Sequence, residues 1–151
     1  MGPIVCATRG GEAGRRTQEW AIARAKEQGV DLIFLCVFDP GFAGSSNESL
    51  RDAVVKEQRW LGRAVLGIAL ARAQKEGVGA GTEVRCGPVL ETIEEFLRQV
   101  DAAALVIGEP KVSSALAAFG PGRVRDFAER VERDTGVEVI VVTPESEQES
   151  G

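Results

Sequence analysis

Five apolar runs alternate along the chain with four amphipathic segments, and this alternation limits the possible folds more than any other feature. The runs cover residues 3–7, 31–38, 81–86, 103–107 and 137–142. They are continuously apolar, which is typical of strands covered by helices on both faces. The helical segments are 14–28, 49–76, one after Gly87-Pro88 and one after Gly122. Strands and helices in turn form right-handed βαβ units. We therefore predict an α/β fold, a single doubly wound five-stranded parallel sheet that is Rossmann-like or flavodoxin-like.

Length and composition predict one domain. The chain has 151 residues, enough for one hydrophobic core. We expect a domain over residues 1–144 and a disordered acidic, Ser-rich tail over 145–151. Cys6, Cys36 and Cys86 lie in or at the ends of apolar runs, so we interpret them as small buried hydrophobes of a reducing, cytoplasmic compartment. No run reaches the ~20 residues that cross a bilayer, so no membrane contact is expected.

Several chemistries are excluded by the residue types present. The chain has no His and no Tyr, which rules out Ser–His and Cys–His nucleophilic pairs. The formal net charge of -5 opposes a broad grip on nucleic acid. The aspartates show no spacing typical of metal ligands; they are Asp31, Asp39, Asp126 and Asp134. We therefore expect no metal site and assign no catalytic residue.

Two glycine-containing turns carry the main functional signal. One follows the first apolar run and reads Thr8-Arg9-Gly10-Gly11. The other begins at Gly108, after the fourth run, and ends where Gly122 opens a helical segment. Backbone N–H groups at a helix start attract phosphate, and ligands of open α/β sheets bind at the carboxyl ends of strands. Together the turns predict a nucleotide-type or anion site.

The two basic residues in these turns have alternative interpretations. Lys111 either blocks a phosphate position, contacts the ligand as a point charge, or is an exposed loop residue. Arg9 either binds a phosphate or carboxylate, pairs with Glu109, or is solvated. Gly10-Gly11 either exposes amides to a ligand or forms an ordinary tight turn. Ser113-Ser114 is interpreted as the cap of a short helix over 115–119.

Five short segments also follow the order and spacing of a known family. They are Ile4-Val5-Cys6-Ala7-Thr8-Arg9-Gly10, the run LIFLCVFDP that starts at Leu32, Cys86-Gly87-Pro88, Leu105-Val106-Ile107-Gly108 and the run that starts at Val139 and ends at Pro144. Over almost the whole chain they resemble the universal stress protein family. The resemblance implies strand order 3-2-1-4-5 and a homodimer through the last strand, from Val137 to Val142. That apolar edge lacks the lysines that prevent pairing.

Many members of that family bind ATP, and the resemblance implies where the ligand would lie. Their signature is Gly, two residues, Gly, nine residues, Gly, then Ser or Thr. Gly108 matches its first position and Lys111 replaces the second Gly. Nine residues later the signature ends at Pro121-Gly122, or at Gly122-Arg123 with a one-residue shift. Arg9 replaces the acidic residue of the first turn. The candidate ligand residues, with Val37 as an apolar wall, are Thr8, Arg9, Gly10, Gly11, Val37, Gly108, Lys111, Gly122 and Arg123.

The sequence thus favours a non-catalytic, stress-associated protein whose cleft binds ATP weakly or not at all, or takes another nucleotide or anion. Two alternatives remain open. One is an ATP-binding protein with slow hydrolysis or phosphoryl transfer, for which Asp39 is the available metal carboxylate. The other is a dimeric interaction module with a closed cleft. Three side chains are given structural roles: Trp20 and Trp60 in the core, and Glu94 in a surface ion pair with Arg98.

Overall fold

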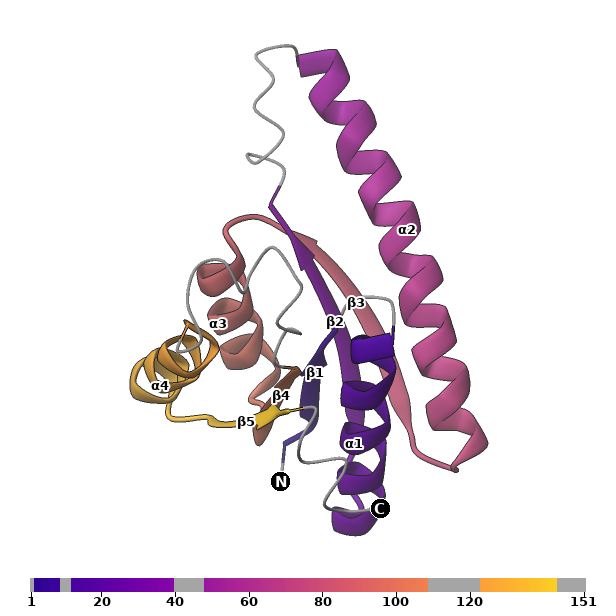
Figure 1. Ribbon diagram of the computed structural model, residues 1–151, viewed down its shortest axis with the longest axis vertical. Coiled ribbons are helices and arrows are strands. Elements are labelled where there is room, and N and C mark those ends of the chain that lie inside the picture. The colour runs from indigo at the N-terminus through magenta and orange to yellow at the C-terminus, as the bar shows by residue number, and fades with distance from the viewer. Residues whose placement is uncertain (1, 9–11, 40–47, 109–122, 144–151) are drawn as a thin grey trace.

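The computed structural model describes residues 2–8, 12–39, 48–108 and 123–143. Figure 1 shows strands and helices alternating along these parts of the chain. The strands are β1 (Ile4–Ala7), β2 (Leu32–Phe38), β3 (Ala80–Cys86), β4 (Ala104–Gly108) and β5 (Glu138–Val142). The helices are α1 (Glu12–Gln28), α2 (Glu48–Lys75), α3 (Val89–Val100) and α4 (Arg123–Thr135).

The strands form one parallel sheet in the order β3-β2-β1-β4-β5. The predicted α/β fold and strand order are therefore confirmed. The chain first adds strands on one side of β1 and then crosses to β4 on the other side. This reversal makes the gap between β1 and β4 the topological switch point, where open α/β sheets bind their ligands.

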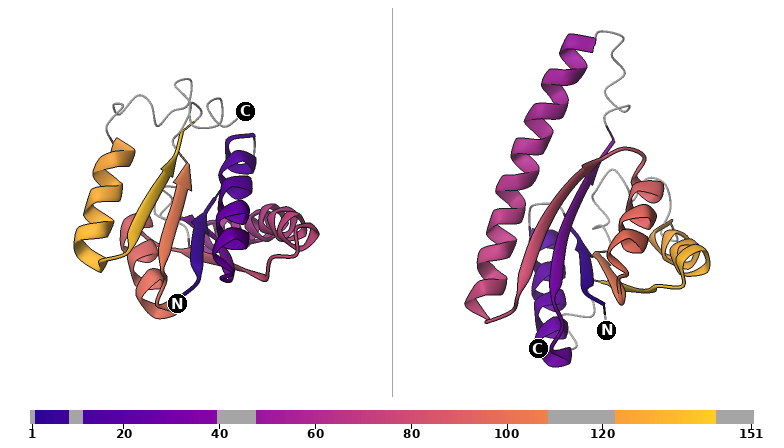
Figure 2. Two further views of the ribbon diagram at one scale, coloured as in Figure 1. Left: turned by 90° about the horizontal axis from the view of Figure 1, so that it is seen from below. Right: turned by 180° about the vertical axis from the view of Figure 1, so that it is seen from behind.

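Helices cover both faces of the sheet, with α1 and α2 on one face and α3 and α4 on the other (Figures 1 and 2). Alternate residues of each strand supply the two faces. In β1, Ile4 and Cys6 join the cluster formed with α1 and α2, whereas Val5 joins the cluster formed with α3 and α4. All three are fully buried. This two-sided burial explains why β1, β2 and β4 are continuously apolar in the sequence. The edge strand β3 differs from that expectation, because it carries Thr82, Glu83 and Arg85 and is partly exposed.

Local backbone chemistry sets the helix ends. Helix α1 ends before Gly29, which has φ +67° and so adopts a left-handed conformation that suits a residue without Cβ. Helix α3 follows Pro88 and is capped by Asp101, whose φ of 53° turns the chain so that the next N–H, of Ala102, donates to the Leu97 carbonyl at 3.0 Å. These ends fix the short connections that return the chain to β2 and β4.

Two sequence-based interpretations need correction. Trp60 was expected in the core, yet 68% of it is exposed on α2, because the helix face that bears it points away from the sheet. Trp20 does pack partly against the core, as expected. Of the three free cysteines, Cys6 is buried, whereas Cys36 and Cys86 are only half-buried.

Among the described helices, none is long and apolar enough to cross a membrane. The predicted tail over 145–151 lies outside the described residues.

Candidate functional site

The carboxyl ends of β1 and β4 meet at the switch point. The register pairs Cys6 with Val106, and two further residues along each strand place Thr8 beside Gly108. The Thr8 amide donates to the Leu35 carbonyl at 2.9 Å, so the end of β1 is held to β2 as well. Thr8 and Gly108 thus lie on neighbouring strands, at the edge where the sequence predicts a ligand.

Gly108 is in close contact with helix α1. A Cβ placed on Gly108 would collide with the hydroxyl oxygen of Thr17, which is itself buried. The first helix can therefore approach β4 this closely only because residue 108 has no side chain. At this position, glycine has a packing role in addition to any contact with a ligand.

A chain of buried polar contacts joins Thr8 to two helices. Gln18 of α1 donates from Nε2 to the Thr8 hydroxyl at 3.0 Å. Arg72 of α2 donates from Nη1 to Gln18 Oε1 at 2.6 Å. Thr8 and Gln18 are both nearly inaccessible to solvent. The Thr8 hydroxyl therefore contacts α1 inside the domain, and this contact fixes the start of α1 relative to β1.

The other predicted ligand residues fall into two groups. Val37 is buried near the end of β2, in the cluster beneath α3 and α4, which is compatible with an apolar wall. Arg123 is the first residue of α4. The remaining candidates lie outside the described residues, namely Arg9, Gly10, Gly11, Lys111 and Gly122, as do Glu109 and the Ser113-Ser114 pair.

Two hollows formed by described residues lie away from the switch point. One, of about 260 Å³, lies between α4 and β5 and is lined by Arg125, Glu129, Glu132 and Val141 among others. The second, of about 400 Å³, lies beside Pro3 and Asp31 at the amino ends of the strands, opposite to the ends that form the switch point. The candidate site is defined by strand topology, at the carboxyl ends of β1 and β4.

The described residues offer little catalytic chemistry. They contain no group of three or more His, Cys, Asp or Glu side chains that could hold a metal ion. Burial raises the pKa of the Cys6 thiol far above its usual range, so this sulfur stays protonated and is a poor nucleophile. What the described residues place at this end of the sheet is the exposed Gly108, since the Thr8 hydroxyl is buried and accepts a hydrogen bond from Gln18.

Sequence reasoning missed Thr17, Gln18 and Arg72. A signal for Gln18 was available, because residues 18, 21, 22 and 25 share one helix face and the last three are apolar and buried. A polar residue on such a face needs a buried partner. Arg72 had no comparable signal, since only the packing of α2 beside α1 brings it to Gln18.

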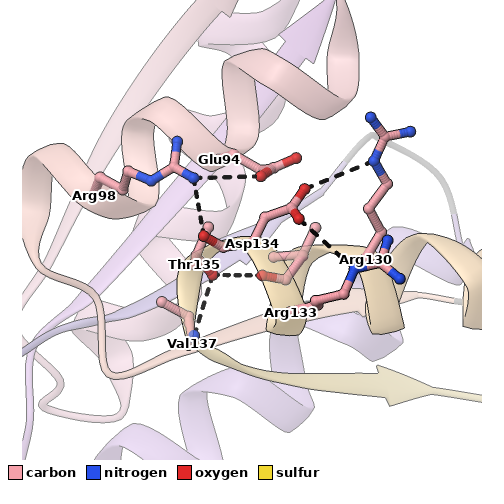
Figure 3. A network of polar contacts seen from close by, with 8 residues as sticks. Glu94, Arg98, Arg130, Arg133, Asp134, Thr135 and Val137 are labelled. Atoms are coloured by element: carbon pink, nitrogen blue, oxygen red, sulfur yellow. Dashed lines mark hydrogen bonds and ion pairs between the residues drawn. The ribbon is translucent and has the colours of Figure 1, made fainter.

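A second polar cluster lies between α3 and α4 (Figure 3). Glu94 was expected in a surface ion pair, but it is buried and faces Asp134. Desolvation, the Asp134 charge and a hydrogen bond with Asp134 raise the Glu94 pKa, while Arg98 and Arg130 lower it. Arg98 lies 3.7 Å from Glu94 and donates to the Asp134 carbonyl at 3.0 Å. Asp134 also pairs with Arg130 at 3.7 Å and with Arg133 at 3.8 Å. We interpret this cluster as a structural link between helices.

The family follows from comparison with known proteins. A model of the universal stress protein family matches residues 1–143. The chain belongs to the universal stress protein family. A search of curated proteins finds no significant match.

Solved structures agree with the fold. A universal stress protein from Archaeoglobus fulgidus shares 22% identity and a TM-score of 0.68, with 94% of this chain and 93% of that chain covered. A universal stress protein solved in complex with cAMP shares 23% identity and a TM-score of 0.67, with 93% of this chain and 96% of that chain covered. An Archaeoglobus fulgidus universal stress protein solved in complex with dAMP shares 23% identity and a TM-score of 0.62, with 94% and 98% covered.

Proposed function

We propose that this member of the universal stress protein family is a non-catalytic, cytoplasmic protein whose switch-point cleft binds ATP weakly or not at all. The cleft instead takes a smaller anion of the nucleoside monophosphate class. The observation that carries the proposal is the pair of basic residues in the two turns, Arg9 after β1 and Lys111 after β4. Arg9 replaces the acidic residue of the family's first turn, and Lys111 replaces the second Gly of its ATP signature.

Charge and size explain the choice of ligand. Arg9 removes the carboxylate that would help to hold a cation beside a triphosphate, and Lys111 adds a side chain where a glycine lets backbone approach phosphate. A single phosphate needs less space and no metal, and a guanidinium and an ammonium suit its charge. Similar proteins have been solved with cAMP and with dAMP, each of which carries one phosphate. These complexes support the nucleoside monophosphate class.

Calorimetric titration tests the proposal. We expect a Kd for ATP, with Mg²⁺ present, weaker than ~100 µM, and a Kd for AMP at least ~10-fold tighter than that for ATP. Arg9→Asp with Lys111→Gly should strengthen ATP binding at least ~10-fold, which is ~1.4 kcal/mol. Arg63→Asp with Lys75→Gly makes the same charge change on exposed residues of α2 and should change neither Kd.

The outcomes separate the alternatives. A low-micromolar Kd for ATP in the unmodified protein would refute the proposal. Release of ADP above background would instead support slow hydrolysis. If neither nucleotide binds, and the double variant binds neither while keeping its circular dichroism spectrum, the cleft is closed and the protein is an interaction module. Mass spectrometry of small molecules released on denaturation would identify a retained ligand directly.

A further inference from the structure

Helix α2 has two apolar faces, and only one of them packs against the sheet. Leu66, Ala69 and Ala73 are fully buried on the inner face. Leu50, Leu61 and Ile68 are exposed at 54%, 49% and 57%. In Figure 1, α2 runs along one side of the molecule and its first turns rise beyond the ends of β2 and β3. The second apolar face therefore lies on the most projecting element of the domain.

The exposed face has the spacing of a coiled-coil seam. Its positions are separated by four and three residues in turn; they are Leu50, Val54, Glu57, Leu61, Ala64 and Ile68. This spacing averages 3.5 residues, the period at which side chains of one helix fit between those of another. Five of the six positions are apolar, and the seam runs for about 27 Å along the helix. A second helix is the partner that fits a surface of this kind.

The same seam is complementary to itself. Because the steps run four, three, four, three, four, the pattern is unchanged when read backwards. An antiparallel copy centred on residue 59 places Leu50 opposite Ile68 of the second copy and Val54 opposite its Ala64. Glu57 comes opposite Leu61 of the second copy, next to the centre. The large residues at one end of the seam thus meet large residues of the other helix.

The residues beside the seam fit the same arrangement. On one flank the register brings the two copies of Trp60 together at the centre, and Ala53 beside Gly67 of the second copy. On the other flank Gln58 meets its own copy and Arg51 meets Val65. No two like charges face each other in these flanking pairs, so charge does not oppose the association.

We propose that α2 binds the α2 helix of a second copy through this antiparallel seam, which we call the α2 seam. The contact goes beyond the proposed nucleotide site and is separate from pairing through β5. Strands β3 and β5 form opposite edges of the sheet, and α2 packs over the β2–β3 side. Glu57 is the one charged residue of the α2 seam, so it weakens the contact and helps to fix its register.

Trp60 provides a readout that the β5 edge does not affect. In a Trp20→Phe background, Trp60 is the only tryptophan, because the sequence has two. As protein concentration rises from ~1 to ~200 µM, acrylamide quenching of Trp60 should fall at least ~2-fold, because the second copy covers the ring. Circular dichroism verifies that every variant is folded.

Three substitutions in that background test the residues of the α2 seam. Leu61→Lys should abolish the concentration dependence of quenching. Glu57→Leu removes the one charge of the α2 seam and should therefore move the midpoint of the quenching curve to at least ~10-fold lower protein concentration. Lys56→Glu reverses an exposed charge outside the seam and should leave the midpoint unchanged.

Two results would overturn the proposal. One is quenching that stays constant to ~200 µM in both the parent and Glu57→Leu. The other is a midpoint of Trp60 quenching against protein concentration that is the same in all variants. Protection of Trp60 by an added acidic helical peptide, without self-association, would also overturn it and assign the α2 seam to a different helix.

Discussion

Gly108 of β4 and Thr17 of α1 are packed so closely that a side chain on Gly108 would overlap the Thr17 hydroxyl oxygen. Thr17 is buried against this strand, and the neighbouring Gln18 donates to Thr8 at the end of β1. Two consecutive polar residues of α1 thereby contact the two strands that flank the switch point. The first helix is held at the candidate site by a close approach on one side and a hydrogen bond on the other.

Gly108→Ala should destabilise the fold. The added methyl group must displace Thr17 or shift α1, and overpacking of this kind costs about 1–3 kcal/mol. Urea unfolding followed by circular dichroism would measure the loss in the free energy of unfolding. Because Gly108 is not among the glycines with positive φ, the loss reports the collision and no backbone strain.

A second background isolates the collision. In Thr17→Ala the overlapping oxygen is absent, and the remaining Cβ of residue 17 is 3.6 Å away, an ordinary contact. The cost of Gly108→Ala should therefore fall by at least about half in that background. Gly81→Ala, where a Cβ has no neighbour within 4 Å, serves as the control. An equal cost of Gly108→Ala in both backgrounds would contradict the explanation.

Gln18→Ala should also lower the free energy of unfolding, by about 1–3 kcal/mol, because it removes a buried donor to Thr8 and an acceptor from Arg72. A double-mutant cycle with Thr8→Ala, measured by urea unfolding, should give a coupling energy of about 0.5–1.5 kcal/mol. Additive effects would show that the contact between the two side chains contributes nothing. Gln28→Ala, at an exposed position on the same helix, is the matched control.

Most of the fold could be predicted from the sequence, because the inner strands β1, β2 and β4 are buried on both faces and the helices are amphipathic. The strand order was predicted from the family resemblance, because the apolar pattern of β4 does not predict which strands it pairs with. Trp60 shows the limit of periodicity. A helix with two apolar faces gives the same pattern whether one face or both are covered, and only the packing of α2 shows that Trp60 is outside.

The candidate site was less predictable. The position of Gly108 at the end of β4 followed from the strand pattern and is confirmed. Its contact with Thr17 did not follow, because it depends on the distance between a helix and a strand far apart in the chain. The interpretation of Glu94 was right about its partner and wrong about its setting. Arg98 does lie 3.7 Å from Glu94, but the carboxyl group is buried and Asp134 of α4 faces it, which spacing along α3 alone could not predict.

Glu94 should make stability depend on pH. Burial and Asp134 raise its pKa in the folded protein above the ordinary value of 4.5, so folding favours the neutral form. This contribution is fully present below the ordinary pKa and is lost as pH rises through the folded pKa. Glu94→Gln keeps a neutral donor toward Asp134. We expect it to unfold at equal or higher urea concentration than the parent at pH 7, and to lose this pH-dependent contribution.

This prediction is tested by measuring the urea midpoint of unfolding from about pH 4 to pH 7 for the parent, Glu94→Gln and Glu95→Gln. Glu95→Gln changes the adjacent, exposed carboxylate and should keep the parent's pH profile. If Glu94→Gln is less stable than the parent at pH 7, the ion pair with Arg98 outweighs the burial of Glu94. The cluster would then be held together chiefly by charge.

The β5 edge leads to a prediction about assembly. Strand β5 ends the sheet, and its central residues Val139, Ile140 and Val141 are only half-buried. We expect a second copy to pair along this edge and give a homodimer at micromolar concentration. Val141 also lines the hollow that contains Glu129 and Glu132, so a lysine there can be accommodated in a monomer. In the dimer the same ammonium would be desolvated, which costs several kcal/mol.

Val141→Lys should therefore stay folded by circular dichroism and lose the β5 dimer, which light scattering would show as a monomer at concentrations below the midpoint of Trp60 quenching. Glu138→Lys places a lysine at the exposed start of the same strand and should weaken the dimer less, because that position stays closer to water. A monomeric unmodified protein at ~100 µM would refute pairing along β5. If Val141→Lys halves the measured mass and Trp60 keeps its concentration-dependent quenching, the β5 edge and the α2 seam act as two independent contacts.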